Sequence, residues 1–190
     1  MPEFLQESGR VGDSKLEWFA LKVRTKAEES VRVALENKGY KAFVPTYETV
    51  RKYSDRLKKI AFPLFPGYVF CRLDRNRRLP VLMTPGVEYA VGFGGRLESI
   101  PAHEMSAIEA VSLAGLDAQP WPYLNTGDKV RIATGALSGV EGLLIRTQSA
   151  DRLILSVEML QRSISVEIER SWVRPILETP AHKQIPGLRK

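Results

Sequence analysis

Residues 63–73 read Pro-Leu-Phe-Pro-Gly-Tyr-Val-Phe-Cys-Arg-Leu, a proline-glycine turn followed by an alternating strand. Alternation places Val69, Cys71 and Leu73 on one face of this strand, and residues 68, 70 and 72 on the other. Cys71 is therefore expected to be a small core residue, because its own segment holds no base that would activate the thiol.

The neighbouring segments predict more strands and two helices. Strands are expected near residues 18–23, 42–44, 47–52, 60–65 and 87–93. Thr25-Lys26-Ala27-Glu28 fits a capping box that opens a helix ending before Gly39. A second helix is expected from Pro101 to Gly115, with Met105, Ile108 and Val111 on one face. Residues 79–83 form a short apolar piece after a polar connector at 74–78. Residues 16–116 therefore predict an α+β domain, an antiparallel sheet flanked by helices.

The pattern becomes all-β after residue 126. Five short strands with glycine-rich turns between them predict a small five-stranded β-barrel over residues 127–177. Residues 117–126 hold two prolines and no periodicity, which favours a linker. Residues 1–15 are expected to be a disordered leader, and residues 178–190 a flexible tail.

Composition narrows the class of protein. The 190 residues carry 28 Lys+Arg and 22 Asp+Glu, a formal charge of +6, which favours an acidic partner. One cysteine and two histidines cannot form a disulfide or the usual zinc sets. The sequence shows no membrane span or signal peptide, so we expect a cytoplasmic protein with no membrane partner. It also lacks known catalytic motifs and paired acids, so neither an enzyme nor a bound cofactor or metal is expected.

Two groups of residues suggest binding. The segment 51–59 holds five bases, Arg51, Lys52, Arg56, Lys58 and Lys59, and reads either as a solvated hairpin tip or as a finger for nucleic-acid phosphates. Aromatic residues cluster in the same domain and either form its core or line a groove for a partner's helices: Trp18, Phe65, Tyr68, Phe70 and Phe93.

Two motifs carry a resemblance to a known family. Residues 63–70, after Trp18-Phe19-Ala20-Leu21 and a basic hairpin, resemble the N-terminal (NGN) domain of NusG-family transcription elongation factors. Residues 127–132 and 135–142 are similar to that family's C-terminal KOW motif. The sequences of residues 64–70 and 162–167 are most similar to those of UpxY-type antiterminators. These are specialised paralogues that resemble RfaH in acting on selected operons.

The resemblance implies a binding mechanism without bond chemistry, in which pausing and termination are reduced. The aromatic groove of Trp18, Phe65, Tyr68, Phe70 and Phe93 would dock on the clamp helices of RNA polymerase. The basic face would contact non-template DNA, with candidates Arg24, Lys26, Arg51, Lys52, Arg56, Lys58 and Lys59.

The chain also departs from the patterns of the family that it resembles. Leu79-Pro80-Val81-Leu82 stands where RfaH-like factors carry a threonine-rich patch for the polymerase gate loop. Residues 159–162 read Met-Leu-Gln-Arg where NusG proteins carry Ile-Phe-Gly-Arg for Rho and ribosomal protein S10. The resemblance thus implies Leu160 and Arg162 as candidate partner residues of the barrel, with S10 as a possible partner of the KOW barrel, and Rho is not expected. The rival hypothesis is a KOW-type RNA- or ribosome-binding module.

Overall fold

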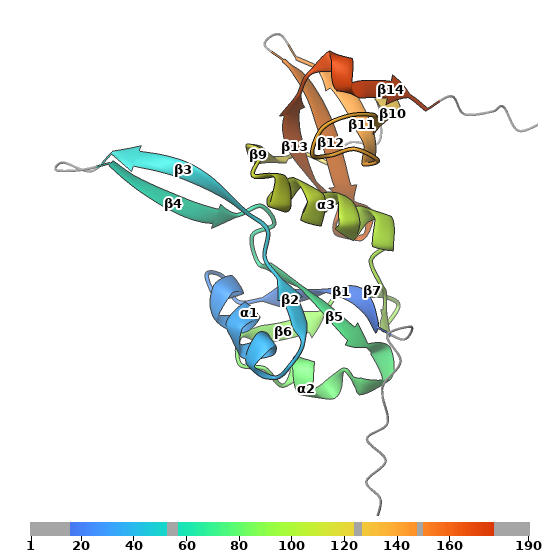
Figure 1. The fold of residues 1–190 in the computed structure, drawn as a ribbon. Helices are drawn as coiled ribbons and strands as arrows, with labels where there is room; N and C mark the ends of the chain where they lie inside the picture. The colour runs from blue at the N-terminus through green and yellow to red at the C-terminus, as the bar shows by residue number, and fades with distance from the viewer. Residues whose placement is uncertain (1–15, 53–56, 124–126, 148–149, 177–190) are drawn as a thin grey trace, which may run out of the picture.

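The computed structural model describes residues 16–52, 57–123, 127–147 and 150–176. A four-stranded sheet, a protruding hairpin, a helix and a six-stranded sheet are its main parts (Figure 1). The elements of the first part are β1 (Leu16–Val23), α1 (Glu28–Asn37), β2 (Lys41–Phe43), β3 (Thr46–Lys52), β4 (Leu57–Pro63), β5 (Tyr68–Asp74), the 3-10 turn η2 (Arg75–Arg77), α2 (Leu79–Leu82), β6 (Val87–Ala90), β7 (Gly92–Phe93), β8 (Arg96–Leu97) and α3 (Ala102–Ala114).

The first sheet has the order β2-β5-β1-β6, and its neighbouring strands are antiparallel. Val69, Cys71 and Leu73 of β5 pack with Val31 and Leu35 of α1, which covers one face. Phe70 belongs to a second apolar cluster that also includes residues of α3. The predicted alternation is confirmed, and both faces of this sheet are covered.

The predicted capping box is absent from the start of α1. Ala27 is the N-cap, and no side chain caps this end of the helix. Glu28 is buried, and its carboxylate accepts a 2.7 Å hydrogen bond from the backbone N–H of Gly67. The box fails because the carboxylate has a tertiary partner, in the turn that leads into β5.

Strands β3 and β4 pair over seven positions, from Thr46–Pro63 to Lys52–Leu57. They form a separate two-stranded ribbon that projects away from both sheets (Figure 1). At its base, Tyr47 and Phe62 place their ring centroids 6.0 Å apart. The predicted strand 87–93 is divided into β6 and β7, because the N–H of Val91 still bonds to Ala20 of β1 while Gly92 pairs with Leu97 of β8.

The C-terminal part forms one antiparallel sheet with the order β14-β10-β11-β12-β13-β9. Its elements are β9 (Ala118–Trp121), β10 (Asp128–Ile132), β11 (Glu141–Arg146), β12 (Asp151–Val157), the 3-10 turn η3 (Glu158–Leu160), β13 (Arg162–Ile168), the 3-10 turn η4 (Arg170–Trp172) and β14 (Val173–Pro175). A closed five-stranded barrel is not confirmed, because the sheet has six strands and ends at β14 and β9. Strand β9 comes from the segment expected to be a linker.

Helix α3 lies between the two sheets (Figure 1). Its buried residues Met105, Ile108 and Val111, which were expected to share one face, belong to the same apolar cluster as Trp18 and Phe65 of the N-terminal part. That cluster continues into Leu153, Leu155, Val157, Ile164 and Val166 of the C-terminal sheet. The two sheets therefore share one core.

Candidate partner and nucleic-acid interfaces

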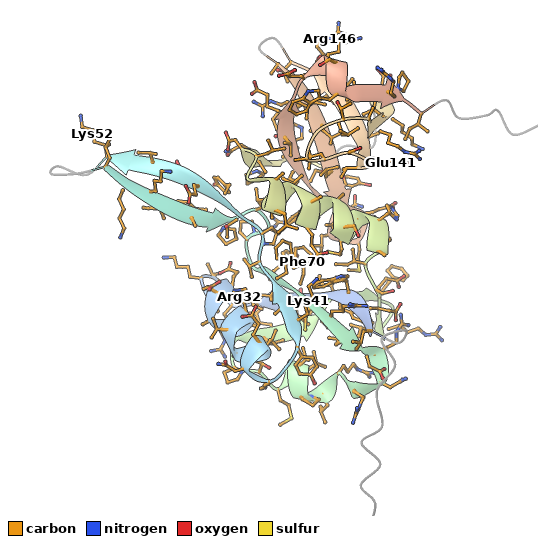
Figure 2. All side chains as sticks on the ribbon, in the orientation of Figure 1. Arg32, Lys41, Lys52, Phe70, Glu141 and Arg146 are labelled. Atoms are coloured by element: carbon orange, nitrogen blue, oxygen red, sulfur yellow. The ribbon has the colours of Figure 1, made fainter. Side chains whose placement is uncertain are left out.

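Four of the five predicted groove aromatics lie together on the face of the first sheet that is turned toward α3. Trp18 is in β1, Phe65 is in the turn before β5, and Tyr68 and Phe70 are in β5. Phe65 and Phe70 meet edge to face, with ring centroids 5.3 Å apart. Edge-to-face packing of this kind fixes both rings, so this aromatic face is a rigid surface. Figure 2 labels Phe70 at the level between the sheet and α3.

The aromatic face is covered in this structure. Phe65 is 1% exposed and Phe70 is fully buried. Met159 and Leu160 of η3 pack against the cluster, and the guanidinium of Arg162 lies 5.5 Å from the ring centroid of Tyr68. The segment 158–162, called here the covering loop, therefore occupies the rim of the aromatic face. It contains both residues that were predicted to bind a partner of the barrel, Leu160 and Arg162.

Polar contacts hold α3 between the sheets. Lys41 Nζ donates to Glu109 Oε1 at 2.7 Å and lies 5.0 Å from the ring centroid of Trp18, which joins β2, α3 and β1. On the other side, Glu104 Oε2 accepts from the backbone N–H of Glu158 at 3.3 Å. Burial raises the pKa of the Glu104 carboxyl above its ordinary value, although this hydrogen bond and nearby His103 act in the opposite direction.

Phe93 is not brought to the aromatic face. It lies in β7, opposite Arg96 of β8, and its side chain is 84% exposed. The sequence placed it in the groove by position within the family. Division of the predicted strand at Val91 and Gly92 gives it a hairpin of its own instead.

The basic hairpin is open to solvent. Lys52 and Lys58 are exposed near the end of the ribbon, and Figure 2 labels Lys52 there. Lys59 is exposed too, with Nζ 3.4 Å from a carboxylate oxygen of Glu48 on the facing strand. Arg56 and the side chain of Arg51 fall outside the described part of the chain. Arg24 and Lys26 are exposed in the connection between β1 and α1, apart from the ribbon.

A basic pocket was missed by the reading of the sequence. It has a volume of about 770 Å³ and lies beside β6, between η2 and the β7–β8 hairpin. Arg75, Arg78 and Arg96 line it together with Tyr89. The three arginines of the segment 74–78 indicate a basic surface in the sequence, although the segment itself predicts only a polar connector.

Cys71 is fully buried, and burial raises its pKa to about 12, so the thiol stays protonated at neutral pH. Within the described ranges, no three His, Cys, Asp or Glu side chains gather as a metal site. None of the helices described here is long and apolar enough to cross a membrane.

Known proteins resemble this chain at the level of sequence and of fold. Residues 16–109 match the family model NusG, described as "Transcription termination factor nusG". The "Transcription termination/antitermination protein NusG" of Lactococcus lactis subsp. lactis is 28% identical over an alignment of 173 residues, and this alignment covers 84% of this chain and 92% of that relative. The protein of the same name from Pseudomonas aeruginosa is 29% identical over 157 residues, covering 78% and 87%.

A solved structure described as "Domain interaction in Thermotoga maritima NusG" has a similar fold. It aligns with a TM-score of 0.50 and 22% identity, over 86% of this chain and 98% of that one. The matched residues 16–109 contain β1, β5 and the aromatic face, and the sequence relatives continue across the C-terminal sheet. Through this N-terminal part, the chain resembles the NusG family.

Proposed function

We propose that this protein is a transcription elongation and antitermination factor that binds RNA polymerase through its aromatic face. The relatives named above are transcription termination/antitermination proteins, which supports the general role. The observation that carries the proposal is the gathering of Trp18, Phe65, Tyr68 and Phe70 on one sheet face within the matched residues. Rigid aromatic surfaces of this kind accept the apolar side of helices, for which the clamp helices of the polymerase are the proposed occupant.

Polymerase binding then requires the covering loop to leave, together with the parts of α3 and the C-terminal sheet that bury Phe65 and Phe70. Tyr68 is the most accessible member of the face, half-buried, and Arg162 lies over its ring. A cation over an exposed aromatic ring is worth about 0.5–1 kcal/mol, so this contact can be exchanged for another one at small cost. The same loop cannot cover Tyr68 and serve a second partner through Leu160 and Arg162 at the same time.

The nucleic-acid contact is assigned to the β3–β4 ribbon and to Arg24 and Lys26. Exposed lysines on a projecting ribbon can reach phosphates without rearrangement of the core. The proposed ligand is the non-template DNA of the elongation complex. Together the two contacts would hold polymerase and DNA in one arrangement and disfavour pausing, on selected operons if the likeness to UpxY and RfaH extends to recruitment.

The covering loop bears on termination. Leucine and glutamine at 160 and 161 replace a phenylalanine and a glycine of the family motif, so an aromatic anchor is lost and a polar side chain is added. The proposed factor therefore does not recruit Rho. A factor that occupies the polymerase without Rho should lower Rho-dependent termination in a reconstituted assay. Ribosomal protein S10 stays a candidate partner of the C-terminal sheet.

The test is retention of the full chain on purified core RNA polymerase. Tyr68→Ala should lose about 2 kcal/mol of binding free energy, because a central aromatic anchor is removed. Phe93→Ala is the matched control, since it removes an exposed ring that lies elsewhere, and it should bind like the parent protein. Equal binding by the parent and Tyr68→Ala, with the fold intact by circular dichroism, would contradict the proposal.

A second variant tests the covering loop. Arg162→Ala removes the cation from above Tyr68 and should increase retention on the polymerase, because the covered form becomes less stable. If this variant binds RNA and neither variant nor parent binds polymerase, the rival function of an RNA- or ribosome-binding module is favoured instead.

A further inference from the structure

The basic pocket is separate from both proposed interfaces. It runs along the edge strand β6, whose residues 88–90 line it together with Val91 and Gly92. Gly95, Arg96 and Leu97 of the β7–β8 hairpin also line it, as do Arg75 of η2 and Arg78, which follows η2. None of its lining residues belongs to the aromatic face or to the β3–β4 ribbon. A ligand here would reach the protein independently of the covering loop.

Its charge is positive and largely uncompensated. Arg78 and Arg96 are exposed, and neither has a carboxylate within salt-bridge distance among the described residues. Arg75 makes one long ion pair, 3.8 Å from a carboxylate oxygen of Glu17. Glu88 is the single acidic side chain in the lining. The side chain of Arg75 also lies over the ring of Phe19, and Arg78 Nη1 donates to the carbonyl oxygen of Arg75. Arginines from two separate segments thus line one hollow, and the donor forks of Arg78 and Arg96 have the geometry that matches phosphate oxygens.

An aromatic ring stands beside these cations. Tyr89 lines the pocket. Its side chain is 55% exposed, although it belongs to β6, a strand of the first sheet. Leu82 and Leu97 add apolar surface to the same lining. An exposed ring next to guanidinium groups is the combination that binds single-stranded nucleic acid, because a base stacks on the ring while arginine holds the backbone.

We propose that this pocket binds a nucleotide unit of a single-stranded nucleic acid. Arg78 and Arg96 would contact the phosphate oxygens, and Tyr89 would stack on the base. The site goes beyond the function proposed above, since it requires neither polymerase nor the ribbon. An acidic peptide could also satisfy the guanidinium groups, but it would leave the exposed ring without a flat partner.

The test uses the full chain alone and a fluorescent single-stranded DNA of about 12 nucleotides, followed by fluorescence anisotropy across a salt series. Arg78→Gln and Arg96→Gln should each weaken binding and lower the slope of log affinity against log salt by about 0.7. Arg77→Gln is the matched control, because Arg77 is an exposed neighbour in η2 that does not line the pocket. It should leave the slope almost unchanged.

The stacking role is tested separately. Tyr89→Leu should weaken binding about tenfold without changing the salt slope, because a stacking surface is lost and no charge is removed. Tyr89→Phe keeps the ring and should bind like the parent. Thermal unfolding of each variant would verify that these exposed substitutions leave the fold intact. Retention of full affinity by Tyr89→Leu would remove the base-stacking part and overturn the proposal.

Three further results would also overturn it. If Arg78→Gln and Arg77→Gln have equal effects, the binding is diffuse attraction to the whole basic surface. If adenosine monophosphate displaces the strand at equal phosphate concentration, the pocket takes a free nucleotide and not a strand. If a polyglutamate peptide binds with the same dependence on Arg78, Arg96 and Tyr89, the ligand is an acidic protein segment. Failure of any of these tests leaves the polymerase retention assay unaffected.

Discussion

The aromatic face and the basic ribbon are the two proposed interfaces of the N-terminal part, and they differ in their exposure to solvent. Phe65 and Phe70 are buried beneath α3 and the C-terminal sheet, whereas Lys52 and Lys58 stand free in solvent. Burial of apolar surface lowers the free energy of the protein. Burial of a lysine without a partner raises it, because the charge loses its hydration. The apolar interface is therefore buried against the rest of the chain, whereas the charged interface is exposed to solvent.

This difference separates stability from binding. A change in the aromatic face affects the shared core and any partner together. A change in the ribbon affects long-range attraction and leaves the core intact. The predictions below test that separation, beginning with the largest effect.

Phe70→Ala should lower the free energy of unfolding by about 3–5 kcal/mol, because it leaves a cavity between the sheet and α3. Urea unfolding followed by circular dichroism would measure it. Phe93→Ala, which removes the same ring from a largely exposed position, should change stability by less than about 0.5 kcal/mol. Similar losses for the two variants would mean that the aromatic face is not part of the core.

Lys52→Gln and Lys58→Gln should each weaken binding to an assembled elongation complex and lower its salt dependence, since each removes one phosphate contact. Their unfolding free energies should stay at the parent value. Arg146→Gln is the control: it removes one exposed charge from the C-terminal sheet, far from the ribbon (Figure 2). If it matches the lysine variants, only total charge matters and the ribbon is a solvated loop.

Gln161→Gly should raise the free energy of unfolding by about 0.5 kcal/mol. Gln161 is in the left-handed region, with φ of 50°, where a side chain is strained and glycine is not. The gain is small because the bond from its Nε2 to the carbonyl oxygen of Glu158, 2.8 Å long, is lost. Gln161→Ala loses that bond without relieving the strain and should be less stable than the parent. Thermal unfolding of the three proteins would rank them.

Glu104→Gln should produce the smallest effect, visible only as a change with pH. Because burial raises the pKa of Glu104 above the ordinary 4.5, the folded protein binds a proton here more tightly than the unfolded chain does. The stability that this proton contributes is present at low pH and is lost as pH rises through the raised value. Relative to the glutamine variant, the parent should therefore become less stable over that interval, and a pH-independent difference would contradict the assignment.

Much of the fold follows from local patterns in the sequence. Alternation along residues 68–73 predicted the two faces of β5, and periodicity predicted that Met105, Ile108 and Val111 share the buried side of α3. These predictions succeed because each depends on side-chain direction within one element. The hydrogen-bond partner of the Glu28 carboxylate could not be predicted in the same way, since Gly67 lies 39 residues away in the sequence.

The candidate sites were harder to predict than the fold. Trp18, Phe65, Tyr68 and Phe70, chosen by their position in the family motif, lie in one apolar cluster, but their burial depends on which surface of α3 and of the C-terminal sheet meets them. Phe93 was misplaced because a strand break at Gly92 has no apolar signature. The basic pocket depends on how residues 75–78, β6 and the β7–β8 hairpin fold against one another, so its arginines were visible as charges and not as a site.

The buried bond between Glu28 and Gly67 also has a consequence for amide exchange. Gly67 lies in a turn with φ of 82°, a position where a backbone N–H would ordinarily exchange with solvent deuterium within seconds. Here the N–H donates a buried hydrogen bond to the Glu28 carboxylate, in the first turn of α1. Its exchange should require α1 to separate from the sheet, and it should be as slow as that of Cys71 in the centre of β5. One amide in a turn would then report the opening of a helix.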